Sequence, residues 1–230
     1  MITAFLPCRK GSQRIKDKNV KNFAGVSGGL LEIKLKQLLA CKEIDKIIVS
    51  SNDDRVLSFS NKINHSKIII DERPEHLGNS QTTTDELIKY VPTIIKEGSI
   101  LWTHVTSPFV TSEIYTNLIN TYKEKFLEGY DSLLTAKKIQ SFLWNSNEPI
   151  NYDRNIEKWP RTQTIEPIYE VDSAAFIASL DIYKKHNDRI GLKPFIYAQG
   201  ALDSIDIDWP EDFTIAEKIF EYKTNKHKES

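Results

Sequence analysis

The sequence predicts an α/β fold, a mostly parallel sheet with helices on both faces. Short runs rich in Ile, Val and Leu alternate along the chain with segments whose apolar residues recur at helical spacing. Strands that alternate with helices form parallel sheets through crossover connections, which cover both faces of the sheet. With 230 residues, 40% of them hydrophobic, the chain is long enough to bury a full core. We expect a single domain over residues 1–230 with one insertion.

Each element is predicted from its local pattern. Strands are expected at the short apolar runs 2–6, 46–51, 67–70, 100–105, 132–135, 174–178 and 195–198. Helices are expected where apolar residues fall near helical spacing, at 30–41, 54–63, 84–97, 111–126, 181–186 and 210–222. Pro92 should kink the third helix or mark its end, whereas Pro210, followed by two acidic residues, suits a first helical turn.

An irregular segment interrupts this alternation at about residues 138–171. Its Trp, Asn and Pro residues break any helix or strand period. We interpret the segment as an insertion, after which the α/β pattern resumes.

The composition excludes several classes of protein. The net charge of -1 argues against general nucleic-acid binding, which usually needs a broad basic face. Two cysteines and five scattered histidines suggest neither a disulfide framework nor a zinc site. No apolar run is long enough to span a membrane, and the first residues lack the features of a signal peptide. We therefore expect a soluble, cytoplasmic protein.

The loop after the first predicted strand is crowded with cations. Between Arg9 and Lys21 there are six Arg or Lys residues against one acid, Asp17. Such a local excess favours an anion, and the loop after the first strand of a parallel sheet is the usual seat of a phosphate. The loop carries neither the P-loop nor the dinucleotide-binding glycine pattern. Arg9 and Lys18 could clamp a triphosphate, and a solvated charged loop is the alternative.

A pair of carboxylates lies far along the chain. Residues 204–208 alternate polar and apolar, so in a strand Asp206 and Asp208 would share one face, with Cα atoms ~7 Å apart. Such a pair can hold Mg²⁺, which prefers carboxylate and phosphate oxygens, although an edge strand with a wet face gives the same pattern. Cations at one strand end together with paired carboxylates favour metal-dependent chemistry on a nucleoside triphosphate.

Three further features have simple structural interpretations. The His104 to Pro108 segment suits a turn at a strand end, where ligands gather. The threonines at 82–84 suit a helix N-terminus, with base reading by a hydroxyl as the second interpretation. Cys8 lacks a visible His and Asp partner, so a packed structural cysteine is favoured over a nucleophile.

Taken together, these motifs resemble the acylneuraminate cytidylyltransferases, the CMP-sialic acid synthetases and their relatives. Residues 7–12, PCRKGS, with Lys18 and Asn19 resemble the signature P-A-R-x-x-S-K-x-x-x-x-K-N. Residues 47–53 resemble the second strand of that family, 106–108 its T-S-P turn, and 203–208 its D-S-I-D-I-D metal motif. The resemblance covers nearly the whole chain. It implies a Rossmann-like sheet, CTP and Mg²⁺ as requirements, and attack of an acceptor hydroxyl on the α-phosphorus of CTP with release of pyrophosphate.

The resemblance also implies roles for residues at the nucleotide. Arg9, Ser12 and Lys18 would bind the triphosphate, and Asn19 would help to read the nucleotide. Arg9 and Lys18 would stabilise the leaving pyrophosphate and, with Asp208, form the catalytic set. Asp206 and Asp208 would hold the metal. Three more nucleotide-site positions are expected by the same comparison, at Gln13, Thr84 and His104.

For the acceptor, the resemblance implies that the insertion packs against a second subunit and lends it residues for the sugar site. A homodimer is therefore expected. Arg161 and Gln163, in a P-R-x-Q context, would bind the acceptor, as would Asp172 and Ser173.

The sequence departs from the signature at several of these positions. Gln13 replaces a Lys, His104 replaces a Gln, and Val110 replaces an Arg. Residues 170–174, EVDSA, stand in place of R-P-N-G-A, so Glu170 would repel a sugar carboxylate where an Arg would bind one. The leading hypothesis is thus a cytidylyltransferase for a sugar acid. The alternatives are a cytidylyltransferase for another acceptor such as a phosphorylated small molecule, a nucleotidyltransferase using another NTP, and a non-catalytic nucleotide-binding relative.

Overall fold

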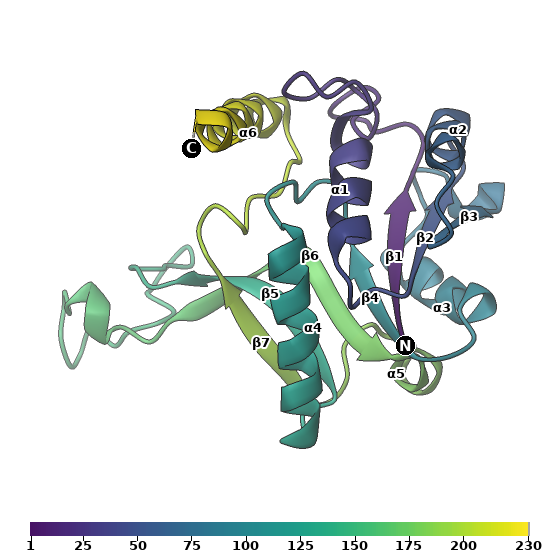
Figure 1. The fold of residues 1–230 in the computed structure, drawn as a ribbon. Helices are drawn as coiled ribbons and strands as arrows, with labels where there is room; N and C mark the ends of the chain where they lie inside the picture. Colours follow the sequence, from purple (N-terminus) through teal and green to yellow (C-terminus); the bar gives the residue numbers. More distant parts are fainter. Residues whose placement is uncertain (230) are drawn as a thin grey trace.

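A seven-stranded mixed sheet with helices on both faces forms the protein (Figure 1). The computed structural model describes residues 1–229. The strands lie in the order β3-β2-β1-β4-β6-β5-β7. Their bounds are β1 Ile2–Cys8, β2 Lys46–Ser51, β3 Ile68–Glu72, β4 Ser99–Thr103, β5 Ser132–Ile139, β6 Ile168–Ser179 and β7 Pro194–Gln199. This arrangement confirms the predicted α/β class.

Strand direction determines where the site forms. β1 pairs in parallel with β2 and β4, β2 with β3, and β5 with β7. β6 lies between β4 and β5 and runs antiparallel to both. The carboxyl ends of β1, β2, β4 and β5 therefore share one edge of the sheet with the beginning of β6, and ligands gather at such an edge.

The helices form two layers. They are α1 Gly29–Ala40, α2 Asp54–Ile63, α3 Thr84–Ile94, α4 Ser112–Leu127, α5 Leu180–His186 and α6 Pro210–Glu229. Apolar side chains of α1, α2, α4 and α6 pack in one core cluster, and those of α3 and α5 pack in a second cluster on the opposite face. β1 shows the alternation that produces this, because Ala4 and Leu6 belong to the first cluster and Phe5 to the second. Both faces are thus covered, as predicted.

Several elements differ from their predicted form. β6 begins at Ile168 and not at residue 174, within the expected insertion, and α6 continues beyond residue 222. The third helix ends at Ile94, with Pro92 in its last turn, and not at residue 97. The predicted strand at 204–208 is wrong, because this segment is a turn followed by irregular chain. Its backbone bonds to a loop and not to a neighbouring strand, since the Ile207 N–H donates to the Thr106 carbonyl at 3.0 Å. Burial of Ile207 against the core explains the apolar position without a strand.

The irregular segment between β5 and β6 projects from the sheet, to the left in Figure 1. The β5–β6 ladder continues to the pair Ile139 and Ile168, so residues 140–167 lie outside the sheet, with one isolated antiparallel bridge between Trp144 and Pro149. It contains one short 3₁₀ turn, Thr162–Thr164. In the described part of the chain, no helix has the length and apolarity needed to span a bilayer.

Candidate active site

Three sequence motifs meet at the carboxyl edge of the sheet. The Lys18 ammonium, from the basic loop after β1, donates to the Ile207 carbonyl at 2.7 Å. The Ile207 N–H in turn bonds to Thr106, in the turn after β4. The basic loop, the T-S-P turn and the acidic motif are therefore in direct contact, although about 190 residues separate the first from the last.

The basic loop is closed by its own polar side chains. The Asn19 amide donates to the Arg9 carbonyl at 3.1 Å, which ties the two ends of the loop together. The Arg9 guanidinium donates to the carbonyl of Asn79 at 3.0 Å, in the segment before α3. Gln13 is exposed and Ser12 is partly exposed, so both are accessible to a ligand. The arrangement presents the loop as a cradle for an anion.

Asp17, the one acid of this loop, is held by a cation from another element. Its backbone has a φ of 59°, and its carboxylate pairs with Arg55 of α2 at 2.7 Å. Arg55 also pairs with Asp53, which caps α2. The hydrogen bond from Arg55 lowers the pKa of Asp17. The negative charge of Asp17 is therefore paired within the protein and does not repel an anionic ligand of the loop.

The two predicted metal ligands differ in environment. Asp208 is 54% exposed, and its oxygens lie 3.4 Å from the Lys18 ammonium and 3.2 Å from the Arg14 guanidinium. Asp206 is largely buried, and burial raises the pKa of its carboxyl group. Its Oδ1 is buried without a hydrogen-bond partner among the described residues.

That orphaned oxygen fits a hard cation such as Mg²⁺. Among the side chains that the structure describes, those of residues 1–226, no third carboxylate, histidine or cysteine joins the pair, so the remaining metal ligands would be phosphate and water.

A buried lysine of α1 holds the T-S-P turn in place. Lys34 of α1 is fully buried, and its ammonium donates to the Ser107 carbonyl at 2.8 Å and to the Tyr115 hydroxyl at 2.7 Å. Burial lowers its pKa well below the ordinary value. One turn further along α1, the Gln37 amide donates to the Pro108 carbonyl at 2.6 Å. The helix thus fixes the T-S-P turn against which the acidic motif rests.

His104 is partly buried at the end of β4. The Trp102 indole donates to its Nε2 at 3.0 Å. Burial and the nearby charges of Arg189, Lys18 and Lys34 lower its pKa to about 3. The imidazole is therefore neutral at physiological pH, with the remaining proton on Nδ1.

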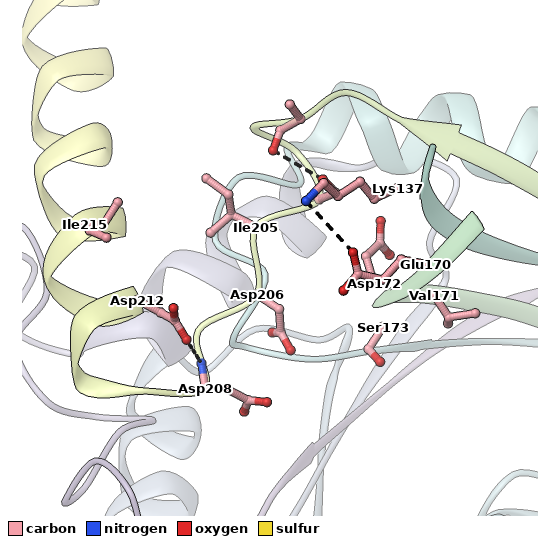
Figure 2. Close-up of a pocket in the computed structure, with 12 residues that line it drawn as sticks. Lys137, Glu170, Val171, Asp172, Ser173, Ile205, Asp206, Asp208, Asp212 and Ile215 are labelled. Atoms are coloured by element: carbon pink, nitrogen blue, oxygen red, sulfur yellow. Dashed lines mark hydrogen bonds and ion pairs between the residues drawn. The ribbon is translucent and has the colours of Figure 1, made fainter. Parts of the chain in front are cut away.

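A cavity of about 580 Å³ opens beside the two carboxylates (Figure 2). Asp206, Asp208, Asp172 and Ser173 line it, together with the cross-strand pair Lys137 and Glu170, whose charged atoms lie 3.9 Å apart. The acceptor residues expected at 172 and 173 are thus in one cavity with the expected metal ligands.

Within this cavity the two predicted acceptor residues differ. Asp172 is buried, and its carboxylate accepts hydrogen bonds from Thr135, Gln199 and the Ala174 N–H. Because these hydrogen bonds engage the Asp172 carboxylate within the protein, Asp172 suits a role in holding the cavity wall and not in direct contact with a ligand. Ser173 has a φ of 59°, a conformation that favours glycine.

Other predicted residues lie outside the cavity lining. Arg161 and Gln163 are exposed in the 140–167 segment. Thr84 is exposed as the first residue of α3, and the preceding Thr83 caps the helix in a capping box with Glu86. Cys8 is buried, and burial raises the pKa of its thiol to about 12, in agreement with a packed structural cysteine.

Sequence reasoning missed three residues near the basic loop and one below it. Arg73 is buried after β3 and donates to the Ser50 hydroxyl and carbonyl. Asn52 accepts from the Lys10 N–H at 3.0 Å and donates to the Gly78 carbonyl at 3.1 Å. Arg14 pairs with Asp208, and Lys34 supports the turn. Only Arg14 carried a signal, as a member of the cationic loop.

Comparison with known proteins identifies the family of the chain. Residues 3–227 match the family described as Cytidylyltransferase. An N-acylneuraminate cytidylyltransferase of Escherichia coli is 24% identical over 99% of this chain, which spans 54% of that protein. A CMP-N,N'-diacetyllegionaminic acid synthase of Legionella pneumophila is 25% identical, and a pseudaminic acid cytidylyltransferase of Campylobacter jejuni is 23% identical. The chain spans 96% and 95% of these two proteins, and each alignment covers 96% of this chain.

Solved structures share the fold at lower identity. A CMP:2-keto-3-deoxy-manno-octonic acid synthetase complexed with CTP superposes with a TM-score of 0.68 at 13% identity, covering 96% of this chain and 99% of the other. A 4-diphosphocytidyl-2C-methyl-D-erythritol synthase from Anaerococcus prevotii has a TM-score of 0.65 at 16% identity, covering 96% and 98%. Since the family match extends over almost the whole chain, the protein belongs to the cytidylyltransferase family and is a nucleotidyltransferase.

Proposed function

We propose that the protein transfers CMP from CTP to a hydroxyl group of a sugar acid related to the nonulosonic acids and releases pyrophosphate. The observation that carries this proposal is the convergence of Lys18 with the Asp206 and Asp208 carboxylates at the edge of one cavity. Cations and paired carboxylates at one site suit a phosphate chain together with a divalent metal. The names of the relatives support a sugar-acid acceptor.

Catalysis would depend on positioning and charge neutralisation. Arg9 and Lys18 would bind the β- and γ-phosphates and neutralise the charge that develops on pyrophosphate. Asp206 and Asp208 would hold Mg²⁺, which polarises the α-phosphate when bound. The neutral His104 would offer one hydrogen-bond donor, its Nδ1–H, to a ligand without adding charge. Ser12, Gln13, Asn19 and Thr84 remain the other proposed nucleotide contacts.

The cavity is the proposed acceptor site. Among the described residues that line it, the one cation is Lys137, which lies beside Glu170, so a sugar carboxylate would compete with Glu170 for the ammonium. We place the acceptor hydroxyl toward Asp206 and Asp208 and its carboxylate toward Lys137. Ser173 lines the same wall.

We also propose that the protein acts as a homodimer in the cytoplasm. Arg161 and Gln163 are exposed and do not line the cavity of their own chain. The same segment exposes large apolar side chains, including Ile156 at 86% and Trp159 at 62%. In a dimer that covers this surface, Arg161 and Gln163 of each subunit would approach the acceptor cavity of the other subunit. Light scattering after size-exclusion chromatography tests this, and a monomer at micromolar concentration would contradict it.

The test of the activity is pyrophosphate release from CTP and Mg²⁺ with a panel of acceptors. The panel contains sialic, legionaminic and pseudaminic acids, Kdo, and phosphorylated small molecules, with reactions that lack acceptor or contain UTP as controls. Asp208→Asn should lower kcat at least about 10³-fold while CTP binding and fold persist. The matched control is Glu211→Gln, which removes an exposed acid in the first turn of α6, close to Asp208 in the sequence, and this variant should retain activity.

The outcomes of this test separate the candidates. Pyrophosphate release with a sugar acid supports the proposal. Release with a phosphorylated acceptor alone would show a cytidylyltransferase whose acceptor is a phosphorylated small molecule and not a sugar acid. Gln13 favours a second candidate, a nucleotide-binding protein without transferase activity, because the signature places a lysine there. CTP binding without release for any acceptor would favour that candidate.

A further inference from the structure

A line of hydrogen bonds begins at the buried Lys34 and crosses the core. The Lys34 ammonium donates to the Tyr115 hydroxyl of α4 at 2.7 Å, and that hydroxyl lies 2.7 Å from Thr103 Oγ1 of β4. The single hydroxyl proton of Thr103 goes to the Ala174 carbonyl of β6, also at 2.7 Å. Thr103 Oγ1 therefore accepts from Tyr115, and every bond points away from the lysine.

The line continues on the other side of one peptide group. The Ala175 N–H, in the peptide that carries the Ala174 carbonyl, donates to Thr135 Oγ1 of β5 at 2.9 Å. Thr135 Oγ1 lies 2.6 Å from Asp172 Oδ1 and 3.2 Å from the Ala175 carbonyl, so its proton goes to the nearer, charged acceptor. This line, the Lys34–Asp172 network, consists of Lys34, Tyr115, Thr103, Ala174, Ala175, Thr135 and Asp172.

The network joins a buried cation to a buried carboxylate. Lys34 is 0% exposed and Asp172 is 7% exposed. The hydrogen-bond partners of the ammonium are neutral oxygens, and those of the carboxylate are neutral donors. A buried charge needs polar groups that point toward it, and hydrogen bonds in series polarise one another. Each charged end therefore stabilises the orientation of the groups that face the other end.

The network ends where β6 departs from regular pairing. The pairing of β5 with β6 shifts register at Thr135, so that residues 172–175 bulge opposite this one residue. Within the bulge, Asp172 Oδ1 also accepts the Ala174 N–H at 3.1 Å, a bond that closes around Ser173. Bulges beside a site direct side chains into it. The place of Ser173 in the cavity wall thus depends on the Asp172 carboxylate.

We propose that Lys34 is a positioning residue for the acceptor, which holds the Asp172 carboxylate, and with it the Ser173 wall of the cavity, through the Lys34–Asp172 network. The inference rests on the proposed function, because the cavity is the proposed acceptor site. Lys34 is not among the residues that line the cavity. Its other hydrogen bond, to the Ser107 carbonyl, holds the T-S-P turn. Lys34 is therefore a branch point between that turn and the cavity wall.

The kinetic test uses the panel sugar acid that reacts fastest and determines kcat and the KM values for CTP and for that acid. Tyr115→Phe and Thr103→Val each interrupt the network and keep the bond from Lys34 to Ser107. Each should raise the KM for the sugar acid about fivefold and leave the KM for CTP within about twofold. Thr103→Ser, which restores the hydroxyl, should return the KM for the acid to within about twofold of the wild type. Lys34→Met removes both branches and should lower kcat as well.

A matched control separates this role from the general cost of removing a buried hydroxyl. Tyr122 is a buried tyrosine of the same helix, and its hydroxyl lies 3.3 Å from Ser99 Oγ, at the opposite end of β4. Tyr122→Phe makes the same chemical change away from the cavity. It should leave both KM values within about twofold of the wild type.

A double-variant cycle in urea unfolding tests the network without any acceptor. Lys34→Met, Asp172→Asn and the double variant give three unfolding equilibrium constants to compare with the wild type. The effect of the double variant should differ from the product of the single effects by at least about fivefold, because the network links the two groups. Lys34→Met combined with Tyr122→Phe is the control pair, and its effects should multiply to within about twofold.

The results that overturn the inference differ from those that overturn the function. An unchanged KM for the sugar acid in Tyr115→Phe and Thr103→Val, or an equal rise in the KM for CTP, would show that the network does not position the acceptor wall. Effects of Lys34→Met and Asp172→Asn that simply multiply would overturn it as well. If no acceptor of the panel gives pyrophosphate release with the wild-type protein, the proposed function is wrong, and the cycle still decides whether Lys34 holds Asp172.

Discussion

His104 should make the stability of the protein fall at mildly acidic pH. Its pKa is lowered from 6.5 to about 3 in the folded protein, so the unfolded chain binds a proton more readily. The associated stability is complete above pH 6.5 and is lost progressively as the pH falls from 6.5 toward about 3. Between pH 7.5 and pH 5 the loss is about 2 kcal/mol, from the ratio of the two protonation equilibria. Protonation also opposes the Trp102 indole, because it places a donor against a donor.

Urea unfolding at both pH values measures this loss, with His104→Gln as the variant. Glutamine can still accept the Trp102 hydrogen bond but does not titrate. The wild-type protein should lose about 2 kcal/mol more than His104→Gln between the two pH values. His186→Gln, at the exposed end of α5, is the control and should behave as the wild type. Equal losses for wild type and His104→Gln would refute the reasoning.

Three other outcomes are expected. Gly29→Ala should lower the free energy of unfolding in urea by about 3 kcal/mol, because φ is +60° and the new Cβ would overlap a backbone carbonyl oxygen. Gly25→Ala, at φ +78° in open space, should lower it by about 1 kcal/mol. Similar losses for the two variants would contradict the overlap. Thr83→Ala removes a capping box and should cost about 1 kcal/mol, and an unchanged urea midpoint would show that the cap is not needed. Cys8 and Cys41 are buried with raised thiol pKa values, so neither should react with Ellman's reagent at pH 8 until urea is added, and stoichiometric labelling of the native protein would count against this.

The parts of the fold that could be predicted from sequence depend on local periodicity. The helix at Asp54–Ile63 and the strand at Lys46–Ser51 have the predicted bounds, since their apolar patterns and caps are local. Strand direction is not local. The pattern of β6 does not reveal that it runs against its neighbours, because burial on both faces gives the same composition in either direction.

The candidate site shows the same limit. The cluster of cations after β1 and the pair Asp206 and Asp208 could be predicted as related, because each is dense in charge. The alternation around them predicted a strand that does not exist, since one buried Ile207 anchored to a turn satisfies the pattern. Lys34 gave no signal, because a lysine among leucines on a helix is normally a solvent-facing residue.

The reversed direction of β6 also affects how the protein can change over evolutionary time. Antiparallel β5 and β6 hold the two ends of residues 140–167 side by side, at the edge where the cavity opens. A loop whose ends are fixed tolerates changes in length at little cost, since each doubling adds only about 0.6 kcal/mol. Replacement of this excursion can therefore alter the surroundings of the cavity without a new sheet, which makes it an interchangeable module beside a constant phosphate-binding edge.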